Sequence, residues 1–121
     1  MTRDELEEYF CRANQESWRK LKQSKEYKWD SIVGNKLIEK IYSETRDWDV
    51  TLGDMGAPGP ASDEEKKDML ESDLPKLERL LAKASSDTAI METPLFVEIV
   101  KRGEETLKNA KELYTILKAE V

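Results

Sequence analysis

The segment from residue 93 to residue 121 constrains the fold more than any other part of the chain. Thr93 is a favourable helix-capping residue, Pro94 suits the first position of a helix, and no proline follows. Apolar or small residues then recur in alternating steps of four and three, which is the spacing of one helical face. They form two adjacent stripes: Phe96, Val100, Gly103, Leu107, Ala110, Tyr114, Leu117 and Val121, and beside them Ile99, Thr106, Leu113 and Ile116.

Two stripes bury a wider face than a two-stranded coiled coil does, so the pattern predicts a helix over 94–120 packed in a bundle. Such a face must be covered, either by helices of the same chain or by another copy. We therefore expect a possible homo-oligomer through residues 94–121.

Three further helices are predicted from capping signals and apolar spacing. A capping box formed by Thr2 and Glu5 starts a helix at about 3–28, and a second helix covers about 31–46. Ser62 precedes a third helix at about 63–84, in which a kink or break is expected near 72–75 because Pro75 removes a backbone donor.

The segment 53–60 holds five of the nine glycines and prolines, so we expect a Gly/Pro-rich crossover loop near residues 49–62. The length suits one core rather than two. The sequence thus predicts a single all-α domain over 1–121, a helical bundle of three to five helices. Residues 22–36 are the place where a short extended piece could form instead.

The absence of histidine and the single cysteine exclude several classes of catalytic and metal site. The chain has no histidine and a single cysteine, so His-dependent triads, histidine or multi-cysteine zinc sites and iron–sulfur clusters within one chain are excluded. The five glycines do not have the spacing of a phosphate-binding loop. We expect no catalytic residues, no metal site and no cofactor. Cys11 follows Phe10 in an apolar patch, which favours a buried, reduced thiol.

The net charge is −6, and no run of apolar residues is long enough to span a membrane. The first residues are acidic, whereas a secretory or mitochondrial leader would be basic. These features predict a cytoplasmic protein with no membrane contact.

One basic and aromatic segment, residues 12–40, stands out in this acidic chain. It carries eight basic and four acidic residues, interleaved with aromatic rings. The candidate partner-binding residues are Trp18, Arg19, Lys22, Lys25, Tyr27 and Trp29. Basic groups beside rings can bind an acidic protein surface or, less favoured in an acidic chain, a nucleic acid. The alternative is an ordinary solvated helix face with its tryptophans turned inward.

The favoured function is a non-catalytic helical protein–protein interaction module: an adaptor, small chaperone, inhibitor or assembly subunit. It would bind its protein partner through the basic-aromatic segment or the long C-terminal helix. The alternative is a small all-α enzyme, dependent on Mg or Mn and similar in chemistry to a nucleotide pyrophosphatase. Its candidate carboxylates are Glu8, Glu44, Asp47, Glu65 and Asp68. Acidic pairs at this spacing are common on helix surfaces, and the long glutamate-rich motifs of that class are not present.

Overall fold

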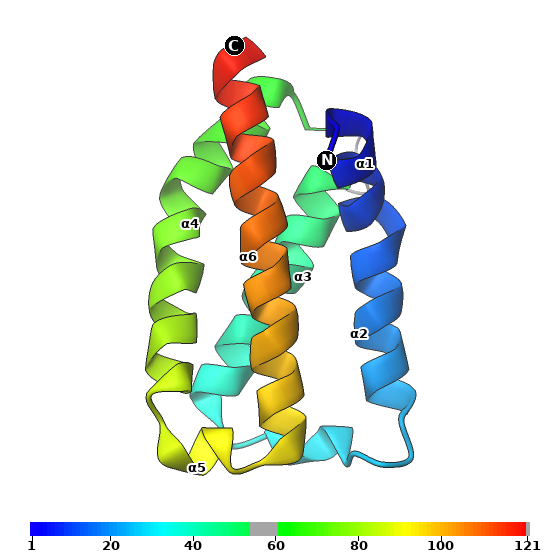
Figure 1. The fold of residues 1–121 in the computed structure, drawn as a ribbon, viewed down its shortest axis with the longest axis vertical. Coiled ribbons are helices and arrows are strands. Elements are labelled where there is room, and N and C mark those ends of the chain that lie inside the picture. The colour runs from blue at the N-terminus through cyan, green and yellow to red at the C-terminus, as the bar shows by residue number, and fades with distance from the viewer. Residues whose placement is uncertain (54–60, 121) are drawn as a thin grey trace.

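A computed structural model describes residues 1–53 and 61–120. Four helical rods run alternately up and down in an antiparallel bundle, with both chain ends near one end of it (Figure 1). The expected all-α bundle is confirmed, and the described residues contain no strand. The rods are α1 (Arg3–Glu8) continued by the π-helix η1 (Tyr9–Ala13) and α2 (Asn14–Gln23); α3 (Lys36–Leu52); α4 (Asp63–Ser85); and α6 (Pro94–Glu120). The 3₁₀ helix η2 (Trp29–Ile32) and the short α5 (Thr88–Met91) lie at the opposite end.

The first rod contains one irregular turn that sequence reasoning did not anticipate. The Thr2 hydroxyl accepts from the Glu5 N–H and the Glu5 carboxylate accepts from the Thr2 N–H, as expected for a capping box. The π-helix η1 then interrupts the α-helical pattern, and such turns shift the following residues around the axis. The rod ends at Gln23 rather than at about residue 28, because Ser24 adopts an extended conformation.

The second rod, α3, begins and ends later in the sequence than the expected range 31–46. Asn35, whose side chain accepts from the Ile38 N–H at 3.2 Å, caps α3, while Trp29–Ile32 forms a separate 3₁₀ turn. Gly34 has φ 96°, a conformation that favours glycine, and so separates the two helices. Since α3 continues to Leu52, it includes the start of the crossover expected near 49–62. Residues 54–60 of that crossover lie outside the described residues.

The third rod continues through its proline. Ser62 caps α4 by accepting from the Glu65 N–H at 3.1 Å, and its hydroxyl also donates to the Glu65 carboxylate. No break forms near 72–75, because α4 is helical from Asp63 to Ser85 with Pro75 in its interior. Pro75 is exposed, so water can reach the backbone carbonyl that the proline leaves without a donor.

The fourth rod, α6, supplies the widest buried face. It begins at Pro94 as expected, although the Thr93 hydroxyl donates to the Ala89 carbonyl of α5. Gly103 allows a close approach: a Cβ there would lie 2.8 Å from Leu81 Cδ2 and 3.2 Å from Ile41 Cγ2. The buried residues of α6 are Leu95, Ile99, Val100, Gly103, Thr106, Asn109, Ala110, Leu113 and Leu117.

This face packs against α1, α3 and α4 of the same chain. The sequence-based reason for expecting a homo-oligomer through residues 94–121 therefore no longer applies, although self-association stays untested. No helix in the described parts of the chain is long and apolar enough to cross a membrane.

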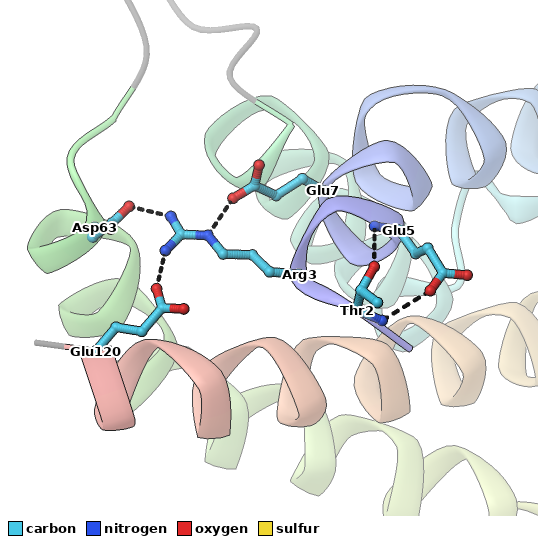
Figure 2. Close-up of polar contacts among 6 residues, drawn as sticks. All are labelled: Thr2, Arg3, Glu5, Glu7, Asp63 and Glu120. Atoms are coloured by element: carbon cyan, nitrogen blue, oxygen red, sulfur yellow. Dashed lines mark hydrogen bonds and ion pairs between the residues drawn. The ribbon is translucent and has the colours of Figure 1, made fainter.

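Arg3 joins three helices at the end of the bundle where the chain begins (Figure 2). Its guanidinium donates from Nε to Glu7 at 2.7 Å, from one terminal nitrogen to Asp63 at 2.5 Å, and from the other to Glu120. These hydrogen bonds raise the pKa of Arg3 and lower that of Asp63. The start of α1 is thus tied to the start of α4 and the end of α6.

Candidate functional site

A groove of about 430 Å³ opens along one face of the first rod and α3. Four basic side chains and two acidic ones line it, so it carries an excess of positive charge in a chain whose net charge is −6. We call it the α2–α3 groove. Its lining residues are Cys11, Arg12, Gln15, Glu16, Trp18, Arg19, Lys22, Tyr42, Arg46, Asp49 and Val50.

Three packed aromatic rings form an aromatic wall beside the α2–α3 groove, and two of them, Trp18 and Tyr42, line it. The Trp18 ring centroid lies 5.3 Å from that of Tyr42 and 6.4 Å from that of Trp29. The ring centroids of Trp29 and Tyr42 are 5.1 Å apart, and the ring planes meet at 79°. In this edge-to-face arrangement the two rings attract each other. Trp18 is only 4% exposed, so it supports the groove from the core.

The cations of the groove differ in how firmly they are held. Lys22 Nζ lies 4.6 Å from the Tyr42 ring centroid and 5.6 Å from that of Trp29, which fixes its charge over the aromatic wall. Arg12 forms an ion pair with Glu8, and Arg19 lies 3.7 Å from Glu16. Arg46, on α3, has no charged or hydrogen-bonding partner among residues 1–53 and 61–120.

A buried polar cluster lies where Asp49 borders the groove. Asp49 is 4% exposed and accepts a hydrogen bond from Asn14 Nδ2 at 2.8 Å. Asn14 Oδ1 in turn accepts from the Tyr9 hydroxyl at 3.0 Å and the Thr106 hydroxyl at 3.2 Å. Burial raises the pKa of Asp49 to about 7, and the hydrogen bond from Asn14 opposes this rise. Burial likewise raises the pKa of Tyr9 to about 12.

The structure brings three of the six predicted partner-binding residues into the groove. Trp18, Arg19 and Lys22 line it, and Trp29 adjoins it through its ring contacts. Lys25 and Tyr27 lie in the connection that follows α2 and do not line the groove.

Sequence reasoning missed the α3 side of the groove. Tyr42, Arg46, Asp49 and Val50 follow the i, i+4, i+7, i+8 spacing of one helical face. Their position opposite α2 depends on how the two rods pack. Their helical spacing is the only sequence signal that could have grouped these α3 residues on one face.

The expectation of a buried Cys11 was wrong. Cys11 is exposed and lines the groove, whereas its neighbours Tyr9 and Phe10 are buried. The π-turn sets which residues face inward here, and local apolar composition does not reveal such a turn.

The carboxylates proposed for a metal enzyme do not converge. No group of three or more side chains capable of holding a metal ion occurs within the described residues. Glu8 pairs with Arg12, and Glu44 accepts from the Trp48 indole N–H at 3.2 Å, with burial raising its pKa. Glu65 is engaged with Ser62 at the start of α4.

Comparisons with known proteins assign no function to the chain. The sequence matches no family model, and no curated protein or solved structure is significantly similar to the chain.

Proposed function

We propose that this protein is a non-catalytic interaction module that binds a protein partner in the α2–α3 groove. The observation that carries the proposal is the concentration of Arg12, Arg19, Lys22 and Arg46 around one groove in a chain with net charge −6. A positively charged groove on a negatively charged molecule attracts a negatively charged surface to the groove, and it disfavours partners of the wrong charge.

The groove suits a contact site because much of it is held in place before binding. The three rings pack against each other, and Trp18 is almost fully buried. Lys22 is positioned over two of the rings. Side chains that are ordered beforehand lose less conformational entropy when a partner binds.

The long C-terminal helix is a weaker candidate for the contact surface. Its wide apolar face is used inside the bundle against α3, α4 and the first rod. A nucleic acid is the less favoured occupant, because its uninterrupted phosphate charge extends beyond the groove and meets the acidic remainder of the molecule.

A photo-crosslinker attached to Cys11, the only cysteine of the chain, tests this proposal at the groove itself. The labelled protein is exposed to light in an extract of the native source, and cross-linked proteins are identified by mass spectrometry. The control carries Cys11→Ser with Ala82→Cys, which moves the label to an exposed position on α4. We expect a protein captured from Cys11 and not from position 82. Identical products from both positions, or none from Cys11, would refute the proposal.

A further inference from the structure

We infer that the occupant of the α2–α3 groove is an acidic segment of the partner protein, whose carboxylates pair with Arg46 and the arginines on the opposite side. This inference rests on the proposed function and specifies the chemistry of the partner. Its strongest support is Arg46, the one lining arginine without an ion-pair or hydrogen-bonding partner in the described parts of the chain.

Arg46 is suited to a carboxylate. A guanidinium presents its donors in a planar fork that matches the two oxygens of a carboxylate. Arg12 and Arg19 come from the first rod, whereas Arg46 comes from α3, so cations line both sides of the groove. An extended acidic segment lying between the two rods can therefore meet guanidinium groups on each side.

The ion pairs already present do not block this arrangement. The side chains of Arg12 and Arg19 are 69% and 62% exposed, and they pair with neighbours on their own rod. Exposed pairs of this kind contribute little to stability, so an incoming carboxylate can replace Glu8 or Glu16 at small cost.

Asp49, the buried acid at the groove, repels an incoming carboxylate less than an exposed, ionised aspartate would. Asp49 is 4% exposed, and burial raises its pKa to about 7, which favours the neutral form below that pH. The remaining lining carboxylate is Glu16, which is already beside Arg19. The groove therefore keeps its positive excess when an anionic segment approaches.

The probe is a fluorescein-labelled octaglutamate peptide, and its binding to the full chain is followed by fluorescence anisotropy. Octaglutamine, which has the same length without charge, is the control peptide. We expect octaglutamate alone to bind, with affinity falling between about 0.01 M and about 0.15 M NaCl because the ions screen the charges.

Two matched variants locate the binding. Arg46→Glu reverses the charge of a groove cation, and Arg79→Glu makes the same change at an exposed position on α4, where Arg79 likewise has no ion-pair or hydrogen-bonding partner in the described residues. We expect roughly tenfold weaker binding for Arg46→Glu and unchanged binding for Arg79→Glu. Circular dichroism checks that both variants fold, and Arg19→Glu replaces Arg46→Glu if the latter does not.

Three results would overturn the inference: equal binding of the two peptides, equal losses in the two variants, or tighter binding of an oligothymidine of the same charge. The last result would assign the groove to nucleic acid. If the protein captured from Cys11 binds but octaglutamate does not, only the acidic chemistry is wrong. If octaglutamate binds but no protein is captured, the proposed function fails instead.

Discussion

Asn14 Nδ2 donates a 2.8 Å hydrogen bond to Asp49 Oδ1, and both residues are buried. This bond joins the first rod, just beyond its π-turn, to α3 beside the groove. The other side of the same amide accepts from Tyr9 and from Thr106 of α6. One asparagine therefore connects three rods, and the cluster couples the bundle interior to the groove wall.

Asp49→Asn tests the energetic cost of the buried acid. Because the folded-state pKa of about 7 lies above the unfolded value near 4, the wild-type protein loses stability from this group as pH rises through that interval. Asparagine can still accept from Asn14 but does not ionise. Relative to wild type, the free energy of unfolding of the variant should gain roughly 2–3 kcal/mol between about pH 5 and about pH 8.

Urea unfolding at both pH values measures this gain. Asp47→Asn is the control, since it makes the same change at an exposed position on the same helix. A difference between Asp49→Asn and wild type that does not change with pH would show that Asp49 does not titrate as described.

Gly53→Ala tests the close approach of α3 to the π-turn. A Cβ at Gly53 would lie 2.9 Å from both Cys11 Cα and Phe10 O, and 2.6 Å from the Asp49 carbonyl oxygen. Since these are backbone atoms and φ is −88°, the strain comes from crowding and not from the conformation of Gly53. We expect a loss of about 1–3 kcal/mol in the free energy of unfolding.

Gly103→Ala is the matched comparison for that variant. Its added Cβ meets side-chain atoms of Leu81 and Ile41, which can shift, and alanine favours the helix by about 1 kcal/mol. Thermal unfolding should therefore show a much smaller loss at position 103. Equal losses would mean that backbone crowding at Gly53 is not the deciding factor.

Arg3→Ala removes the three-way contact at the end of the bundle. The side chain of Arg3 is 26% exposed, so we expect a loss of ~1 kcal/mol that shrinks as salt is added. Arg79→Ala, at an exposed site on α4, should change the unfolding free energy by less. A salt-independent loss at Arg3 would indicate that its aliphatic stem, and not its charge, supplies the stabilisation.

The exposure of Cys11 predicts its reactivity in the folded protein. One equivalent of a maleimide should react under native conditions without prior unfolding, as measured by intact mass. Because Cys11 lines the groove and not the core, the adduct should leave the helical circular dichroism spectrum unchanged. A thiol that reacts only in urea would contradict its placement on the groove.

The sequence predicted the long helices where local signals agreed. Ser62 at the start of α4 and Pro94 at the start of α6 lie where the capping and proline patterns place them. The α3 boundary was wrong because several polar residues between 30 and 35 can start a helix, and the tertiary arrangement selects Asn35. Local sequence could not decide whether the helix breaks near Pro75, because a proline is tolerated within α4 where its surroundings are exposed.

The candidate site could be predicted only on its α2 side. The basic-aromatic pattern pointed to Trp18, Arg19 and Lys22, but charge along the chain does not tell which residues of α3 lie opposite them. Arg46 lies outside the segment 12–40 and enters the groove through helix packing alone. The burial of Trp18 and exposure of Cys11 depend on that packing and on the π-turn.

The most direct test of the central claim is the affinity of the protein captured from Cys11 for the Arg46→Glu and Arg79→Glu variants, measured by isothermal titration calorimetry. If the α2–α3 groove is the docking site, Arg46→Glu weakens binding roughly tenfold or more and Arg79→Glu binds like wild type. If both variants bind like wild type, or both lose affinity equally, the partner does not dock in this groove.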